Sequence, residues 1–383
     1  MELSVQLFTG SAITAEQIDI SKIIKKLNNI YKRTNISGAY IGWNKDIDIS
    51  GIINLLKDRG TDIYLWLPVF SELSLLADFK PLIGIDGKII ETLYNTDNEE
   101  LFTFCCPADP ENVKTVIDVF EKYYDKDIYD GIFLDKIRFP SFIGGLGTVT
   151  SCYCDYCRSV FDLPTQDDLD FEDIANPMGI SVYKDLHYEM DPAYKKLFDY
   201  KANAVYRSLK QLCSYFKGRG FKICLDLFTP TTAFFVGQDY HKLLKLTDIV
   251  KPMLYNVTNA PAGIPFEINT YAGAFDKNPE NAIARKIHLS EAVGYYEKDF
   301  IQREVEGIKS VITQNELKTK LHVGIEVNYV EDIAPVTGEY IRESVTNVKS
   351  ADGIIASWNL NTMPEDNIMC LLDAMEDMDS KGI

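Results

Sequence analysis

Three acidic residues stand where a folded chain rarely places a charge, each directly after a run of apolar residues. Asp135 follows GIFL, Asp226 follows KICL and Glu326 follows HVGI. A carboxylate inside an apolar strand is costly unless it is paired or solvated, so these residues are candidates for chemistry. Two carboxyl groups that flank a glycosidic bond can cleave it, because one protonates the departing oxygen while the other attacks or activates water.

We expect Asp135 and Glu326 to be the working pair, with the aspartate as nucleophile and the glutamic acid as acid and base. Asp226 can replace either one. A structural ion pair with a nearby lysine or arginine is the alternative for each acid taken singly. Arg138 can hold Asp135 ionised or bind a substrate carboxylate through two parallel hydrogen bonds. Lys251 can bind the substrate or satisfy a buried acid.

Aromatic residues gather on the same apolar runs. All three tryptophans and two strand-end tyrosines are candidates for substrate binding: Trp43, Trp66, Trp358, Tyr255 and Tyr329. Aromatic faces suit the apolar faces of sugar rings, because stacking buries area while the hydroxyl groups stay free to form hydrogen bonds. Packing inside the fold is the alternative for each tryptophan alone. Together, the acids and the aromatic residues predict a carbohydrate site.

The stretch SCYCDYC places Cys152, Cys154 and Cys157 in one short loop. The four histidines show no pairing with these thiols, which argues against a catalytic cysteine. Tetrahedral zinc takes four ligands, and the stretch FTFCCPADP supplies the fourth, with Cys106 favoured and Cys105 as the substitute. A site closed by four thiolates leaves no position for water, so its role would be structural. Thiols without a metal in a reducing compartment are the alternative.

The elements that position these residues are visible as eight apolar, β-rich runs, with segments of helical period between most of them. The runs cover residues 3–10, 36–44, 62–70, the region of 131, 222–230, 248–256, 321–329 and 352–360. Eight alternations of strand and helix favour a parallel (β/α)8 TIM barrel, and an open doubly wound sheet is the alternative. Neither a GxGxxG after the first run nor a P-loop is present, so no organic cofactor is expected.

A barrel of this kind carries its active site at the C-terminal ends of its strands. We expect one barrel domain over residues 1–383, with long loop insertions at 71–110 and 140–190 near the active-site face. Side chains from the fourth and seventh strands can converge over the barrel axis. This convergence is the reason for pairing Asp135 with Glu326.

Composition excludes several classes of partner. The chain of 383 residues carries 57 acidic and 39 basic residues, and its formal net charge of −18 argues against nucleic acids and anionic membranes as partners. We find no secretory signal and no apolar run near the roughly 18 residues of a membrane span, so we expect a cytoplasmic protein. Eight cysteines in that compartment should be thiols or metal ligands rather than disulfides. The oligomeric state is open, and a homo-oligomer is one of the possibilities.

Three stretches between residues 100 and 165 carry a family resemblance. CPADPE, DGIFLDKIRFPS and CYCDYCRSVF resemble the glycoside hydrolases of the TIM-barrel superfamily, whose members carry such an aspartate in the fourth strand. The cysteine pattern is similar to the structural zinc cluster of glycoside hydrolase family 42 β-galactosidases. That resemblance implies four zinc ligands: Cys106, Cys152, Cys154 and Cys157. Those β-galactosidases end the fourth strand with Asn-Glu, whereas this chain has Leu134 and Asp135, so their catalytic acid and their substrate do not carry over.

The sequence therefore predicts a glycoside hydrolase with a structural zinc ion and a carbohydrate substrate. Two other functions stay open. One is a carbohydrate-binding barrel without catalytic activity, and the other is a metal-dependent lyase or hydrolase with Asp135, Asp226 and Glu326 as oxygen ligands. His322 lies deeper on its strand than Glu326, and we expect it to be a core residue.

Overall fold

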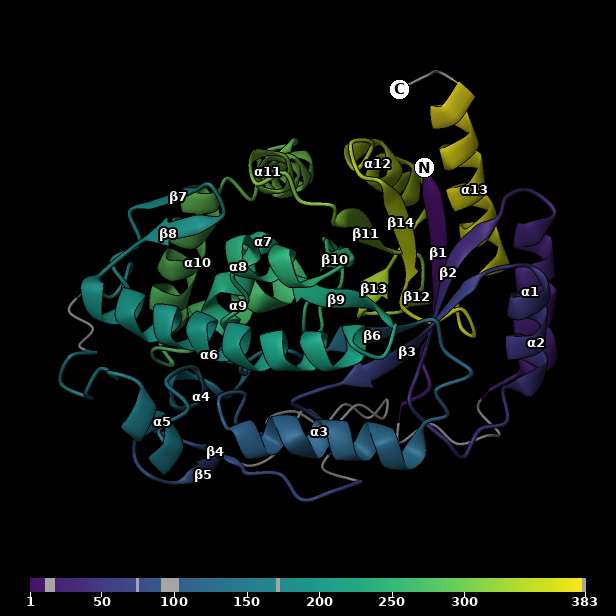
Figure 1. The fold of residues 1–383 in the computed structure, drawn as a ribbon. Helices are drawn as coiled ribbons and strands as arrows, with labels where there is room; N and C mark the ends of the chain where they lie inside the picture. Colours follow the sequence, from purple (N-terminus) through teal and green to yellow (C-terminus); the bar gives the residue numbers. More distant parts are fainter. Residues whose placement is uncertain (11–17, 74–75, 91–102, 170–172, 381–383) are drawn as a thin grey trace.

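The computed structural model describes residues 1–10, 18–73, 76–90, 103–169 and 173–380 (Figure 1). Eight parallel strands form a closed barrel, and β1 pairs with both β2 and β14 to close it. The strands are β1 (Glu2–Leu7), β2 (Ile36–Ile41), β3 (Asp62–Pro68), β6 (Gly131–Asp135), β9 (Lys222–Phe228), β10 (Ile249–Met253), β11 (Lys320–Glu326) and β14 (Gly353–Ser357). The predicted TIM barrel is confirmed, and the open sheet is wrong.

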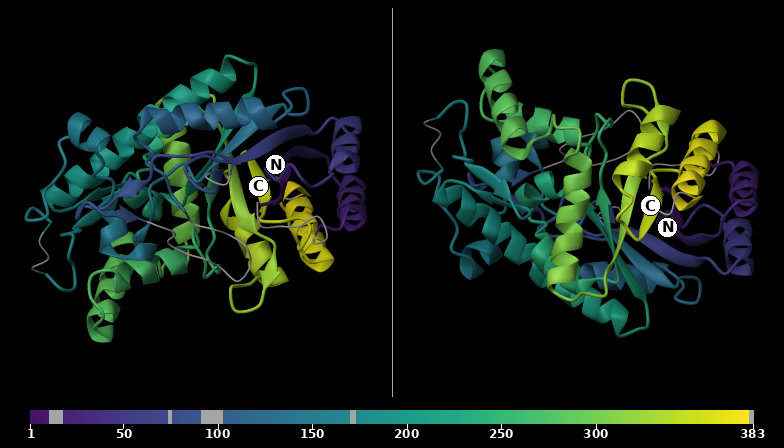
Figure 2. Two further views of the ribbon diagram at one scale, coloured as in Figure 1. Left: turned by 90° about the horizontal axis from the view of Figure 1, so that it is seen from below. Right: turned by 90° about the horizontal axis from the view of Figure 1, so that it is seen from above.

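Helices surround the barrel, as two further views show (Figure 2). The longer helices are α1 (Ile20–Tyr31), α2 (Ser50–Asp58), α3 (Pro110–Tyr123), α6 (Pro192–Lys217), α9 (Ile264–Gly273), α10 (Pro279–Val293), α11 (Phe300–Gln314), α12 (Gly338–Asn347) and α13 (Glu365–Ser380). Three of them, α3, α6 and α10, begin in the same way. A capping aspartate or asparagine accepts a backbone N–H, and the proline that follows starts the helix without needing a hydrogen-bond acceptor.

Aromatic rings fill the barrel interior below the C-terminal ends of the strands. Tyr40 and Tyr64 stack with ring centroids 4.8 Å apart, and Phe133 packs on Tyr40 at 4.7 Å. Gly131 makes room for this layer, because a Cβ atom there would lie 2.4 Å from the Tyr64 ring. The residues that come later on the same strands, including Asp135, therefore lie above a packed floor.

Two long connections follow β3 and β6 and lie side by side. The first carries the hairpin β4 (Leu82–Ile83) and β5 (Ile89–Ile90), and the second carries α4 (Leu146–Val149), α5 (Asp155–Val160) and the hairpin β7 (Val182–Lys184) and β8 (His187–Glu189). The backbone N–H of Tyr153 donates to the carbonyl of Ile83 over 2.8 Å, which ties the two connections together. Shorter elements follow β9 and β11: α7 (Pro230–Ala233), α8 (Tyr240–Leu243), β12 (Tyr329–Val330) and β13 (Ala334–Pro335).

A buried lysine joins the first helix to the loop after the last strand. Lys26 lies on α1, and its Nζ donates to the carbonyl oxygens of Leu360, Asn361 and Met363 over 2.7, 3.0 and 2.6 Å. The backbone N–H of Leu360 donates in turn to the carbonyl of Gln6 on β1 over 2.7 Å. The loop after β14 is thus fixed against both α1 and β1, next to the point where the barrel closes (Figure 1).

Candidate active site

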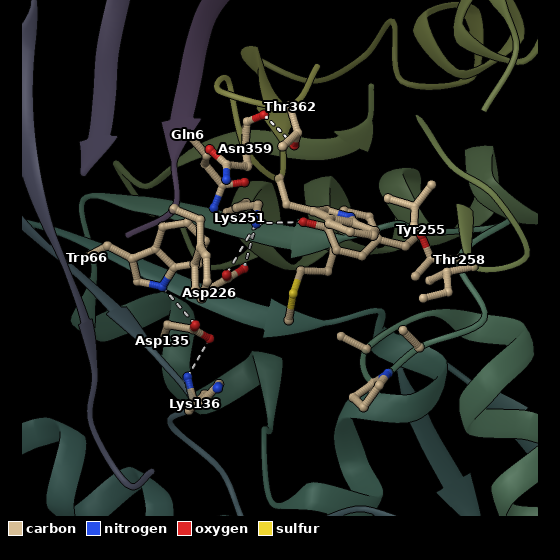
Figure 3. Close-up of a pocket in the computed structure, with 18 of the residues that line it drawn as sticks. Gln6, Trp66, Asp135, Lys136, Asp226, Lys251, Tyr255, Thr258, Asn359 and Thr362 are labelled. Carbon is tan, nitrogen blue, oxygen red and sulfur yellow. Dashed lines mark hydrogen bonds and ion pairs between the residues drawn. The ribbon is translucent and has the colours of Figure 1, made fainter. Parts of the chain in front are cut away.

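A cavity of about 540 Å³ opens at the C-terminal ends of the barrel strands (Figure 3). Carboxylates, cations and aromatic rings from β3, β6, β9, β10 and the loops that follow them line it: Trp66, Asp135, Arg138, Asp226, Lys251 and Tyr255. The cavity lies in the place where TIM barrels carry their active sites.

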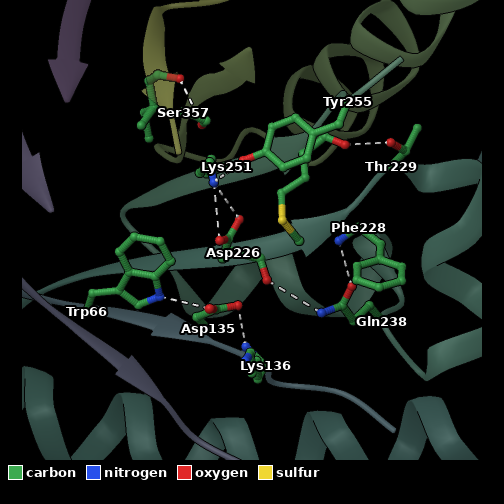
Figure 4. A network of polar contacts seen from close by, with 12 residues as sticks. Trp66, Asp135, Lys136, Asp226, Phe228, Thr229, Gln238, Lys251, Tyr255 and Ser357 are labelled. Carbon is green, nitrogen blue, oxygen red and sulfur yellow. Dashed lines mark hydrogen bonds and ion pairs between the residues drawn. The ribbon is translucent and has the colours of Figure 1, made fainter. Parts of the chain in front are cut away.

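Asp135 and Asp226 meet in this cavity because their strands are neighbours. Leu134 pairs with Leu225 in the β6–β9 register, and each aspartate is the next residue on its strand. Both side chains are buried, with 8% of Asp135 and 2% of Asp226 exposed. Figure 4 shows the two carboxyl groups side by side, each with its own partners. The structure therefore brings together two of the three predicted catalytic acids.

The carboxylate of Asp135 accepts two hydrogen bonds from the protein. Nε1 of Trp66 donates to one carboxylate oxygen over 2.8 Å, and the backbone N–H of Lys136 donates to the other. Lys136 has a φ of 50°, in the left-handed region that a lysine rarely adopts, and its side chain forms a buried ion pair with Glu72. The left-handed backbone at Lys136 turns its N–H group toward the carboxylate and holds the side chain of Asp135 in one orientation.

Asp226 has a different environment. Nζ of Lys251 lies 3.2 Å from each of its oxygens and also donates to the hydroxyl of Tyr255 over 2.9 Å. Burial raises the pKa of Asp226 to about 8, an effect that Lys251 opposes and Asp135 reinforces. Burial works against the charge on Lys251, but Asp226 and Tyr255 raise its pKa above the ordinary value. Burial thus favours the protonated form of Asp226, and the nearby lysine favours the ionised form.

The end of β9 is fixed by a buried glutamine from the following loop. Oε1 of Gln238 accepts the backbone N–H of Phe228 over 2.8 Å, and its Nε2 donates to the carbonyl of Asp226 over 3.5 Å (Figure 4). Arg138 lies against the same strand end, with its guanidinium carbon 4.4 Å from the centre of the Phe228 ring and 4.7 Å from that of Phe104. Arg138 lines the cavity as predicted, and the two rings fix the plane of its side chain.

Glu326 is not among the residues that line the cavity. Its side chain is fully buried and accepts five hydrogen bonds, from the backbone N–H groups of Asn256, Val257 and Thr258 and from the hydroxyls of Thr258 and Tyr340. These contacts anchor the loop after β10. The structure therefore places Asp226, and not Glu326, with Asp135 in the wall of the cavity, and the oxygens of Glu326 accept hydrogen bonds from the protein.

Four of the five aromatic residues that the sequence predicted as substrate-binding line the cavity, and one does not. Trp66, Trp358, Tyr255 and Tyr329 line the cavity, as does Lys251. Trp43 was also expected to bind substrate, and it is not among the residues that line the cavity. Its ring packs edge-on against Phe8 at 5.4 Å and against Trp66 at 6.3 Å. Trp43 therefore supports two rings that do line the cavity.

Sequence reasoning missed the neutral polar residues of the cavity: Gln6, Thr258, Asn359, Asn361 and Thr362. Gln6 carried a usable signal, because it is a polar residue in the apolar first run, LSVQLF. The rule that selected the acids, which looks for a polar residue within an apolar run, also selects Gln6. The others lie in loops, where polar residues are common and give no such signal.

Four cysteine sulfurs gather where the two long connections meet. Sγ atoms of Cys106, Cys152, Cys154 and Cys157 all lie within 4.8 Å of one another. Two of the separations are 3.5 and 3.9 Å, close to the edge of about 3.8 Å that a tetrahedron with zinc–sulfur bonds of about 2.3 Å requires. Cys105 lies outside this group, so Cys106 is the fourth member.

Donors around the cluster suit thiolates. The backbone N–H of Ile83 lies 3.3 Å from Sγ of Cys152, and the hydroxyl of Tyr200 lies 3.2 Å from Sγ of Cys157. Outer contacts of this kind orient metal ligands and stabilise their charge. The four residues fit a metal ion in number, atom type and spacing.

The chain matches no protein-family model and no curated protein sequence. Solved structures share its fold. A β-galactosidase from the psychrophilic Marinomonas ef1 superposes with a TM-score of 0.53 and 12% identity, over 100% of this chain and 61% of that one. The α-L-fucosidase isoenzyme 2 from Paenibacillus thiaminolyticus superposes with a TM-score of 0.52 and 10% identity, over 100% of this chain and 49% of that one.

This chain thus spans about half to three fifths of the length of these two proteins. The likeness shows that this chain shares its barrel fold with both proteins. Among the described residues, no helix is long and apolar enough to cross a membrane.

Proposed function

We propose that this protein is a glycoside hydrolase in which Asp135 and Asp226 carry the chemistry. The observation behind the proposal is a pair of carboxyl groups with unlike environments in one cavity. Asp135 accepts hydrogen bonds from Trp66 and from the backbone, which fix its carboxyl group toward the cavity as a nucleophile or base. The pKa of Asp226 is raised to about 8, mainly by burial, which suits an acid that still holds its proton at neutral pH. Environments that separate two carboxyl groups in this way assign the roles of base and acid.

In this mechanism, Asp226 gives its proton to the glycosidic oxygen as the bond to the anomeric carbon breaks. Asp135 attacks that carbon, or activates the water that does so. Lys251 then faces a carboxylate rather than a carboxylic acid, and its charge stabilises the product of the proton transfer. The cation therefore favours the step in which Asp226 gives up its proton.

Aromatic rings and the fold together support a carbohydrate as the substrate. Trp66, Trp358 and Tyr329 line the cavity and can stack on the apolar faces of sugar rings. The two solved structures with the same fold are named as a β-galactosidase and an α-L-fucosidase, which both act on glycosides. We propose a small glycoside or an oligosaccharide as the substrate class.

The geometry disfavours metal-dependent chemistry by the three strand-end acids. Such a site needs the oxygens of Asp135, Asp226 and Glu326 at one point. The only group of three or more ligand atoms that lies close enough for a metal ion, within the described residues, is the cysteine cluster. The oxygens of Glu326 are taken up by hydrogen bonds to the loop after β10.

The cysteine cluster is proposed to hold one structural Zn²⁺. A zinc ion there would join the connections after β3 and β6, since Cys106 lies on the first and the other three cysteines lie on the second. Elemental analysis of the purified protein should find one zinc per chain. Cys157→Ser should lower that content and the melting temperature, whereas Cys105→Ser, outside the cluster, should leave the zinc content unchanged.

The glycosidase proposal is tested with a panel of 4-nitrophenyl glycosides that includes the β-galactoside and the α-L-fucoside. The wild-type protein should release nitrophenol from at least one of them. Asp135→Asn should lower that turnover by about 1,000-fold while the variant still binds the sugar in calorimetry. Asp58→Asn changes an exposed acid on α2 and serves as the matched control. Unchanged turnover in Asp135→Asn would overturn the assignment, and binding without any turnover would leave a carbohydrate-binding barrel.

A further inference from the structure

Gln6 differs from the other polar residues inside the barrel. It lies on β1, its side chain is fully buried, and it lines the cavity. Neither its Oε1 nor its Nε2 has a hydrogen-bond partner among the described residues of the protein. Its backbone carbonyl is engaged by the N–H of Leu360, so the residue itself is held in place. An unpaired amide is thus presented to the cavity from a rigid strand.

A buried amide without a partner destabilises a fold, since it gives up hydrogen bonds to water and gains none in return. Such groups are rare in native proteins, and those that occur need an explanation. An apolar side chain of the same size would fill this position on β1 as well. The position of Gln6 at the cavity supplies an explanation, because a bound ligand can provide the missing partners.

The polar lining of the cavity is unevenly distributed. In Figure 3, Gln6 lies on the same side as Asn359 and Thr362, with Lys251 and Asp226 below them and Asp135 farther away. The charged groups thus lie toward the ends of β6, β9 and β10, and the polar groups of Gln6, Asn359 and Thr362 lie toward β1 and the loop after β14. Phe8, two residues after Gln6, also lines the cavity and packs edge-on against Trp66 at 5.3 Å. β1 and the residue that follows it therefore offer an amide and an apolar ring to the same ligand.

We infer that Gln6 is a substrate-binding residue that holds two neighbouring hydroxyl groups of one sugar ring. Its Oε1 accepts a hydrogen bond from one hydroxyl, and its Nε2 donates one to the other. A carboxamide carries an acceptor and a donor side by side, which matches a vicinal diol. The two hydroxyls lie on the edge of the ring away from Asp135. The inference takes the sugar from the proposed function, but it does not depend on hydrolysis.

The test uses Gln6→Met, which keeps the length of the side chain and removes both polar atoms. Thr9→Val is the matched control, since Oγ1 of Thr9 is also buried without a partner among the described residues but does not line the cavity. Both changes are made in the Asp135→Asn background and in the wild type. Binding of galactose, fucose, glucose and mannose, and of their singly deoxygenated analogues, is measured by calorimetry.

Gln6→Met should weaken binding of the best sugar by about 10- to 100-fold, and Thr9→Val should leave the affinity unchanged. Removal of one of the two hydroxyls from the sugar should weaken binding to the wild type by about tenfold and have little further effect in Gln6→Met. Without sugar, Gln6→Met should melt at or above the wild-type temperature, because no hydrogen bond within the protein is lost.

Four results overturn the inference. One is wild-type affinity in Gln6→Met, and another is the same loss for every deoxy sugar in both proteins. The third is the absence of binding of all four sugars and their analogues to the wild-type protein. The fourth is a lower melting temperature with unchanged sugar discrimination, which would make Gln6 a structural residue. If only the proposed function is wrong, sugars bind with an affinity that depends on Gln6, while no 4-nitrophenyl glycoside is turned over.

Discussion

The ends of β9 and β11 carry two acids that look alike until their hydrogen bonds are compared. Asp226 and Glu326 follow apolar runs of the same kind, both are almost fully buried, and burial raises the pKa of both. The protein gives Glu326 five hydrogen bonds, whereas it gives Asp226 one lysine and an opening to the cavity. Strand position and burial therefore find both acids, and unused hydrogen-bonding capacity is what separates the proposed catalytic group from the anchor.

The largest effect that this comparison predicts is on turnover. Asp226→Asn should lower kcat by about 1,000-fold, because the amide cannot protonate the glycosidic oxygen. The loss should be much smaller for a 2,4-dinitrophenyl glycoside, whose leaving group departs without a proton. Steady-state kinetics on both substrates measures the difference. An equal loss on both would mean that Asp226 does not act as the acid.

Glu326→Gln should show the opposite pattern. The substitution replaces one carboxylate oxygen by an NH2 group, which cannot accept hydrogen bonds from the surrounding N–H and O–H groups. We therefore expect the free energy of unfolding to fall by about 3 kcal/mol. Turnover of the folded fraction should fall by less than tenfold. Denaturant unfolding measures the stability, and Glu331→Gln, a change to an exposed acid five residues along the chain, is the control. A stable but inactive Glu326→Gln would break the comparison and restore Glu326 as a catalytic residue.

The pH dependence of activity sharpens the comparison further. Asp226 must be protonated to act as the acid, so kcat/KM should fall as the pH rises through about 8. Lys251 lowers the pKa of Asp226, and Lys251→Met should therefore move this alkaline limb to higher pH. The pH–rate profiles of the two proteins test the shift. A limb that moves to lower pH in Lys251→Met would contradict the assignment.

A third buried acid, Glu304 on α11, should show the smallest effect. It accepts hydrogen bonds from the hydroxyl of Tyr183 and the backbone N–H of Thr231, and burial raises its pKa to about 7. A glutamate in the unfolded chain has a pKa of about 4.3, so above that pH the folded chain still keeps a proton on Glu304 that the unfolded chain has released. The free energy of unfolding should fall as the pH rises from about 4.3 to 7. In Glu304→Gln the free energy of unfolding should fall less steeply with rising pH, because the proton bound by Glu304 no longer contributes. Urea unfolding at several pH values measures the difference.

The barrel was predictable because the pattern that encodes it is local. Each of the eight apolar runs corresponds to a barrel strand. The cysteine cluster was predictable for a similar reason, because three of the four ligand candidates lie close together in sequence, in one loop. The choice of Cys106 over Cys105 followed the resemblance, and the positions of the sulfur atoms agree with it.

The division of labour among the acids was not predictable, because it depends on contacts between distant parts of the chain. Glu326 is occupied by the N–H groups of a loop about 70 residues earlier in the sequence, and no pattern around either segment announces that contact. Trp43 lies outside the cavity lining for a related reason, since Phe8 and Trp66 pack against it. Gln6 was missed because only charged and aromatic residues of the apolar runs were taken as candidates.

The bonds that Lys26 makes to the loop after β14 have a consequence for how the protein acquires activity. They join positions more than 330 residues apart, and the carbonyls they hold belong to the segment that presents Trp358 and Asn359 to the cavity. A partly synthesised chain that has formed its first six or seven strands still lacks that wall. During refolding, recovery of the proposed sugar binding should therefore lag behind helix formation, because the loop after β14 must first meet α1 and β1.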